Sequence, residues 1–158
     1  MRRIVNNLVL FSSLALVLTT ATVVLADQVY HSERLDFTLT ADGQKAGHPT
    51  LRDGHVVNIH PNGPVNGAIE RYMINGAKPE TSYNVNLSAF AGGCGGNPLF
   101  ELTTTVLKTD KNGNAHGEKI FTPVDLAGLS GRTVGANWTL VSGGVDAYKT
   151  ICTTVKID

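Results

Sequence analysis

The chain has 158 residues, of which 13 are basic and 13 acidic, so its formal net charge at pH 7 is zero. After Arg2 and Arg3, the lysines and arginines are scattered singly, which excludes a basic patch for nucleic acid or anionic lipid. With 42% hydrophobic residues and two cysteines, the chain is long enough to bury a core without metal or multiple disulfides.

The N-terminus has the composition of an export signal. Arg2 and Arg3 precede an apolar run over residues 8–25, and the small residue Ala26 offers a cleavage position. We therefore predict a secretory signal peptide over residues 1–26 and a single domain over residues 27–158. A retained membrane anchor is the alternative, because the apolar run approaches the length of a spanning helix. After cleavage we expect no membrane span, in a protein secreted to a periplasm or outside the cell.

Beyond the leader, short alternating segments separated by turn residues predict an all-β fold. Residues 33–41 alternate with Leu35, Phe37 and Leu39 inward, and the glycines within residues 42–54 indicate a loop. Further strands are predicted at 55–60, 65–74, within 77–90, and at 99–108, 115–123, 133–141 and 147–157. About eight strands without a convincing helix favour an antiparallel β-sandwich.

The alternation also predicts which side chains face the core. In one predicted strand Phe100, Leu102, Thr104 and Val106 share one face. In another, Val134, Ala136, Trp138 and Leu140 face inward, and the last strand contains Ile151, Val155 and Ile157. Trp138 is expected to be the central core aromatic. For residues 65–74 two faces stay open, because Val65, Ile69 and Met73 compete with Ala68, Tyr72 and Ile74.

The pattern Pro79-x-Thr81-x-Tyr83-x-Val85 resembles the tyrosine corner of fibronectin type III and related immunoglobulin-like domains. The resemblance covers residues 77–90 and implies a Greek-key sandwich, in which the Tyr83 hydroxyl returns to backbone a few residues upstream. It implies a structural role for Tyr83 and no activity. Four predicted strands follow the Tyr83 strand where a fibronectin type III domain has one, so only the general immunoglobulin-like class is expected.

The two cysteines, Cys94 and Cys152, are predicted to form a disulfide, because the export signal places them in an oxidising compartment. The bond would tie the loop after the Tyr83 strand to the last strand. A redox pair or a shared metal site is the alternative, but the sequence contains no Cys-x-x-Cys motif.

Histidines are the candidates for a transition-metal site, which needs imidazoles that converge from rigid elements. His55 and His60 are five residues apart in one predicted strand, so their side chains should point to opposite faces. The sequence lacks the His-x-His pair of the copper/zinc superoxide dismutases, another sandwich class of similar strand number. A site assembled from loops remains the alternative, with His48 and His116 as candidate ligands.

Asp110-x-Asn112-x-Asn114 resembles the opening of an oxygen-lined calcium loop. Ala115 stands where the glycine of such a loop belongs, and Phe121 where its bidentate acid belongs. We therefore predict an Asn-Gly hairpin turn, retain Asp110 as a candidate ligand, and expect no bound metal or cofactor.

Residue patterns typical of a catalytic centre are also missing from the sequence. The run from Gly128 to Arg132 contains a serine but lacks the second glycine of a nucleophile elbow. The acids are dispersed, and we expect most of them on a solvated face rather than paired in a cleft; they include Asp36, Glu70, Glu80, Glu101, Asp110, Glu118, Asp125 and Asp146.

The remaining candidate site is a row of polar side chains on the outer face of two predicted strands, comprising Asn84, Asn86, Ser88, Thr103 and Thr105. Such a face can bind a protein or a glycan partner, or simply face water. The sequence thus predicts a secreted, non-catalytic module with a binding or structural role. The alternatives are a metal-binding sandwich that uses loop histidines and a carbohydrate-binding module.

Overall fold

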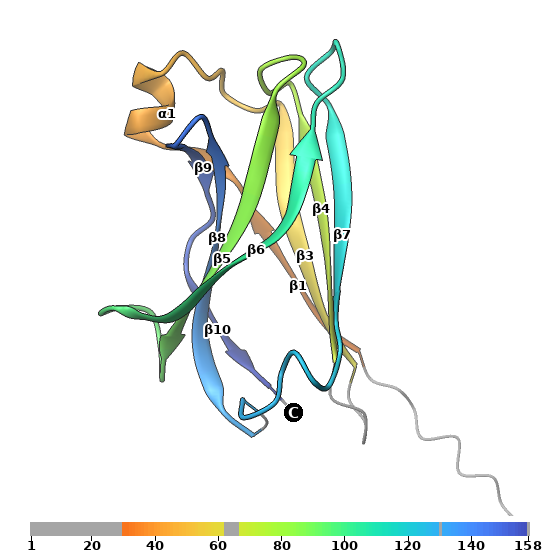
Figure 1. Ribbon diagram of the computed structural model, residues 1–158, viewed down its shortest axis with the longest axis vertical. Coiled ribbons are helices and arrows are strands. Elements are labelled where there is room, and N and C mark those ends of the chain that lie inside the picture. Colours follow the sequence, from red (N-terminus) through yellow and green to blue (C-terminus); the bar gives the residue numbers. More distant parts are fainter. Residues whose placement is uncertain (1–29, 62–66, 130, 158) are drawn as a thin grey trace, which may run out of the picture.

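The computed structural model describes residues 30–61, 67–129 and 131–157, and its strands form two sheets in which every described pairing is antiparallel (Figure 1). One sheet has the order β1-β3-β4-β7, with bounds Tyr30–Asp36, Asp53–Pro61, Ala68–Asn75 and Ala115–Phe121. The other has the order β2-β9-β8-β5-β6, with β10 also paired to β8. Its bounds are β2 Thr38–Leu39, β5 Ser82–Ala91, β6 Pro98–Lys108, β8 Thr133–Ser142, β9 Val145–Lys149 and β10 Thr153–Lys156.

This arrangement confirms the predicted antiparallel β-sandwich. The predicted signal peptide, residues 1–26, and the first two residues of the predicted 65–74 strand lie outside the described residues. Within the described part of the chain, no helix is both long enough and apolar enough to cross a bilayer.

The predicted first strand is divided between the two sheets. It pairs with β3 as β1 up to Asp36 and with β9 as β2 from Thr38 onward, and the Phe37 amide between them bonds to the Gly54 carbonyl at 2.8 Å. Leu35 and Phe37 are both buried as predicted. Alternation reports which side chains are inward, and it cannot report that the chain changes sheet between them.

A short helix, α1 (Ala41–Lys45), replaces part of the loop that was predicted over residues 42–54. Its N-cap is Thr40, whose Oγ1 accepts the Gly43 amide at 2.9 Å. Gly43 packs so closely on β9 that a Cβ there would lie 2.3 Å from the Ala147 carbonyl oxygen. A helix of five residues is too short to show a helical hydrophobic period, so the sequence did not indicate it.

Strand β4 resolves the two faces that the sequence left open. It buries the even-numbered side chains Ala68, Glu70, Tyr72 and Ile74. Glu70 is only 2% exposed, so its expected place on a solvated face is wrong. The burial follows from the register, because Glu70 shares a face with Tyr72 and Ile74, whose apolar surface must be removed from water.

Strand β6 carries a bulge that reverses its faces halfway along. Val85 pairs with Thr105 whereas the next residue, Asn86, pairs with Thr103, so Thr104 is an extra residue in β6. Above the bulge Leu107 is buried and Val106 is 46% exposed, which corrects the prediction that Val106 shares one face with Phe100 and Leu102. Below it, Phe100 and Leu102 share a face, as predicted, and this face is turned toward the space between the sheets.

The predicted last strand is also interrupted. It forms β9 and β10, which both pair with β8, and Ile151, predicted within one continuous strand, lies between them and is 70% exposed. Val155 and Ile157 are buried, and so are the four residues of β8 that were predicted to face inward, including Trp138. The Thr150 amide donates to the Trp138 carbonyl at 3.0 Å, which keeps the interrupted segment against β8.

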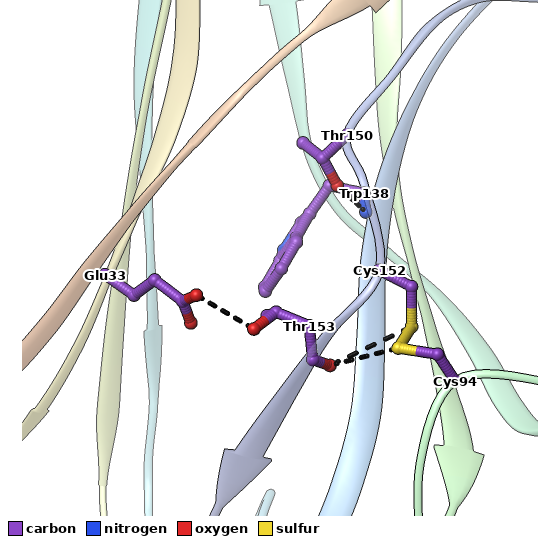
Figure 2. Close-up of a disulfide and its surroundings, with 6 residues drawn as sticks. All are labelled: Glu33, Cys94, Trp138, Thr150, Cys152 and Thr153. Carbon is purple, nitrogen blue, oxygen red and sulfur yellow. Dashed lines mark hydrogen bonds between the residues drawn. A yellow bond between two sulfur atoms is a disulfide. The ribbon is translucent and has the colours of Figure 1, made fainter.

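The predicted disulfide is present between Cys94 and Cys152, with Cα atoms 5.8 Å apart (Figure 2). It joins the loop after β5 to the segment between β9 and β10. Beside it, the Thr153 hydroxyl donates to the Glu33 carboxylate at 2.8 Å, and this bond links β10 to β1 of the opposite sheet. Closing a loop of 58 residues stabilises the fold by about 4 kcal/mol in the chain-entropy model.

Candidate binding cavity

An interior cavity of about 70 Å³ lies between the two sheets, at the end that the connection from β7 to β8 closes. Its walls are mainly apolar. They are built by Asn58, His60, Ala68, Glu70 and Phe121 from one sheet, and by Leu87, Ala89, Phe100, Leu102, Val134, Ala136, Trp138 and Val155 from the other. Asp125, Leu126, Leu129 and Ile157 complete the lining.

Phe100 and Leu102 form the mouth of this cavity. Both line it, yet they are 36% and 41% exposed, so the cavity reaches the surface at these two side chains. Figure 1 shows the cause: β6 lies beside β7 at the top of the molecule but swings away from it toward the lower left. The bulge at Thr104 turns Phe100 and Leu102 toward the cavity at the point where β7 no longer covers them.

The connection after β7 is held over the cavity by its own hydrogen bonds. Asp125 Oδ2 accepts the amide and the hydroxyl of Thr122, both at 2.8 Å, and these bonds lower the pKa of the Asp125 carboxyl. Farther along, the Gly131 amide donates to the Ile157 carbonyl at 2.6 Å, which fixes the end of the connection to the C-terminal segment. Leu126, which belongs to this connection, is buried as part of the core.

A chain of hydrogen bonds runs from Glu70 in the cavity wall through Tyr72 to Thr104 of β6. The Tyr72 hydroxyl donates to the Glu70 carboxylate, and Tyr72 Oη lies 2.8 Å from Thr104 Oγ1. Thr104 in turn contacts the Val85 carbonyl at 3.2 Å, so the bulged residue of β6 is bonded to both sheets. The chain holds one oxygen of the Glu70 carboxyl group in place.

Burial raises the pKa of Glu70 to about 7, although the hydrogen bond from Tyr72, the nearby Trp138 indole and the charge of Lys119 oppose the shift. Burial also raises the pKa of Tyr72, with the neighbouring Glu70 carboxylate adding to the effect. Near neutral pH the cavity wall therefore contains a carboxyl group that exists in both protonation states beside a neutral phenol.

Two more polar side chains meet Glu70 in the cavity. Asn58 pairs with Glu70 across β3 and β4, which places the two side chains next to each other on the inner face. Asn58 is 3% exposed, and its Oδ1 accepts no hydrogen bond from the described residues. The Trp138 indole, 1% exposed, lies near the Glu70 carboxyl on the opposite sheet, and its Nε1 has no hydrogen-bond partner among the described residues. The apolar cavity therefore ends in three polar groups: the Asn58 Oδ1 acceptor, the Trp138 indole N–H donor and the Glu70 carboxyl.

The predicted structural residue Tyr83 is fully buried at the other end of the sandwich. Its hydroxyl lies 3.0 Å from Nδ1 of His48, and the backbone of Lys78, five residues upstream, also hydrogen-bonds to it. Burial lowers the pKa of His48 and raises that of Tyr83. His48, a candidate metal ligand, instead packs with Tyr83 and Tyr148 in a cluster of rings.

The other two candidate ligands, His116 and Asp110, line a shallow surface hollow beside the 109–114 turn. Asp110 Oδ1 accepts the amides of Asn112 and Asn114 at 2.8 and 2.9 Å, and these bonds lower the pKa of its carboxyl. This geometry confirms the predicted hairpin turn. The described residues contain no group of three His, Cys, Asp or Glu side chains arranged to hold a metal ion.

The predicted polar row on β5 and β6 is only partly assembled. Asn84 is exposed, and the Thr103 hydroxyl donates to Asn86 Oδ1 at 2.8 Å on the outer face. Ser88 is 7% exposed and donates to Glu101 at 3.0 Å. Thr105 does not belong to this row, because its side chain faces Gly117 of β7 on the inner side of the bulge.

The sequence does not predict the cavity residues, because the hydrophobic alternation in their strands is weak. Asn58 and Glu70 occupy inward positions of strands in which hydrophobic residues stand at both parities, so the buried face could not be read from alternation. The available indication was a polar residue at the centre of each strand, in Val56-x-Asn58-x-His60 and Ala68-x-Glu70-x-Tyr72.

Comparison with known proteins does not assign a family. No protein-family model, no curated protein and no solved structure matches the chain. The function is therefore argued from the cavity and from the polar groups inside it.

Proposed function

We propose that the protein is a secreted, non-catalytic binding module with an immunoglobulin-like sandwich, and that it holds a small apolar molecule between its two sheets. The observation that carries the proposal is the cavity of about 70 Å³ whose mouth is formed by the exposed side chains of Phe100 and Leu102. Transfer of each ligand CH₂ group from water into such surroundings contributes about 0.8 kcal/mol.

The size of the cavity limits the ligand. An engineered apolar cavity of about 150 Å³ binds benzene, so this smaller one accepts a narrow chain rather than a ring. The chain would continue outward between Phe100 and Leu102, and the ligand would cover apolar surface that these residues now present to water.

Other features support the remaining parts of the proposal. The Cys94–Cys152 disulfide suits an oxidising compartment. The Tyr83 hydroxyl, bonded to backbone five residues upstream, supports the immunoglobulin-like class.

The proposal is tested by titrating hexan-1-ol into the mature protein and following the backbone amide signals by NMR. We expect saturable shifts at residues that line the cavity, such as Leu87 and Ala136. Substitution Ala136→Leu places three more carbon atoms in the cavity and should abolish these shifts while the protein stays folded.

The matched control is Ala91→Leu, the same change at an exposed position at the end of β5. This variant should bind hexan-1-ol as the wild type does. Shifts that do not saturate, or that persist unchanged in Ala136→Leu, would overturn the proposed function.

A further inference from the structure

The polar groups at the inner end of the cavity restrict the head group of the ligand, and this inference rests on the proposed function. We infer that the cavity selects an uncharged ligand whose head group donates a hydrogen bond, in the manner of the hydroxyl of an alkyl alcohol. The donor would be directed at Asn58 Oδ1, and the alkyl chain would extend toward Phe100 and Leu102.

The need for a donor follows from Asn58. Its Oδ1 is buried, lines the cavity and accepts no hydrogen bond from the described residues. A buried acceptor without a partner destabilises the protein, so a bound molecule that supplies a donor gains an interaction that an apolar molecule cannot. A hydroxyl is favoured over a simple donor, because it can also accept from the Trp138 indole on the opposite wall.

The absence of charge follows from the acids of the lining. Glu70 and Asp125 are the ionisable acids in the cavity wall, and above pH 7 both carry negative charge. A carboxylate ligand would be repelled by both, while the positive charge of Lys119 lies over the ring of Phe121, 5.2 Å from its centroid. An ammonium head would lose its hydration in a narrow apolar cavity, at a cost that two carboxylates already engaged by Tyr72 and Thr122 do not offset.

The test compares four probes with the same six-carbon chain at pH 8, where the Glu70 carboxyl is mainly ionised. They are hexan-1-ol, 1-methoxyhexane, hexanoate and hexylammonium, and the dissociation constant of each is measured by NMR titration. We expect the methyl ether, which has no donor, to bind about fivefold to tenfold more weakly than the alcohol. Hexanoate and hexylammonium should bind more weakly than the ether.

The variant Asn58→Leu, close in shape to asparagine, removes the acceptor and should bind the alcohol and the ether equally. Asn84→Leu, at an exposed position of β5, is the control and should retain the wild-type preference. Because the four-probe comparison uses the wild-type protein, it gives an answer even if Asn58→Leu does not fold.

The outcomes separate the two proposals. If none of the four probes binds, the proposed function fails and the inference fails with it. If the probes bind but the ether equals or exceeds the alcohol, or a charged probe binds best, the inference alone is overturned. Retention of the alcohol preference in Asn58→Leu would also overturn it, because the donor would then have another partner.

Discussion

At the scale of single residues, Glu70 has the most unusual surroundings. It is a carboxylic acid inside the sandwich, bonded to Tyr72 and adjacent to Asn58. Its pKa of about 7 in the folded protein lies above the value of 4.5 expected in the unfolded chain. Between these two pH values the native state keeps a proton that the unfolded state has lost.

The protein should therefore be more stable at pH 4.5 than at pH 8 as far as Glu70 is concerned. Between pH 4.5 and pH 7 the native state binds more protons than the unfolded state. Raising the pH through this window therefore lowers the free energy of unfolding. The decline should amount to about 3 kcal/mol between pH 4.5 and pH 7. Urea unfolding across this range should show a smaller decline in Glu70→Gln than in the wild type.

The control for this measurement is Glu80→Gln, an exposed glutamate in the turn before β5. It should follow the pH dependence of the wild type. A pH dependence in Glu70→Gln identical to that of the wild type would contradict a raised pKa at Glu70.

Gly113 shows how a turn residue is fixed by a close approach of backbone. Its φ is +78°, and a Cβ at this position would lie 2.0 Å from the Ala77 carbonyl oxygen. Gly143 has a φ of +57° but nothing within 4 Å of the same position. Gly143→Ala should therefore cost about 1 kcal/mol from its backbone conformation alone.

Gly113→Ala adds a clash with backbone and should lower the free energy of unfolding by about 3 kcal/mol or more. Chemical denaturation of both variants checks the difference. Equal losses in the two variants would show that the contact with Ala77 relaxes without cost.

At the scale of elements, the disulfide anchors the loop after β5, which covers the outer face of β8. A Cβ on Gly135 of β8 would lie 2.3 Å from the Gly93 carbonyl oxygen, so the loop that contains Cys94 packs directly on this strand. The pair Cys94→Ser and Cys152→Ser should lower the free energy of unfolding by about 2 to 5 kcal/mol.

The loss should appear in urea unfolding of the double variant and equally in the reduced wild type. Reduction of the double variant itself serves as the control, because it has no bond to break. A double variant as stable as the oxidised wild type would contradict a stabilising role for the bridge.

The elements also show how far the sequence predicts this fold. Alternation located the strands and the inward residues of β8 correctly, because these depend on local burial. The Cys94–Cys152 pairing was predicted on a different ground, the expected export of a chain with two cysteines, and the disulfide is present. Alternation failed at Thr104 and at Phe37, where one extra residue or one change of sheet alters the partners without altering hydrophobicity. Such features depend on which strand lies alongside, and this is not encoded locally.

At the scale of the whole molecule, the cavity arises from the way the two sheets meet. Residues from β3, β4 and β7 face residues from β5, β6, β8 and β10, and the connection after β7 closes the end. Asn58 and Trp138 are 80 positions apart in the sequence, and no local pattern predicts that they line one space. The candidate site could therefore not be predicted from the sequence, although the sandwich that contains it could.

The most direct test of a ligand held between the sheets is a crystal structure of residues 27–158 grown with hexan-1-ol. We expect electron density for one chain in the cavity, with its hydroxyl within hydrogen-bonding distance of Asn58 Oδ1 and its tail between Phe100 and Leu102. A cavity that contains only ordered water, or a mouth closed by Phe100 and Leu102, would contradict binding between the sheets.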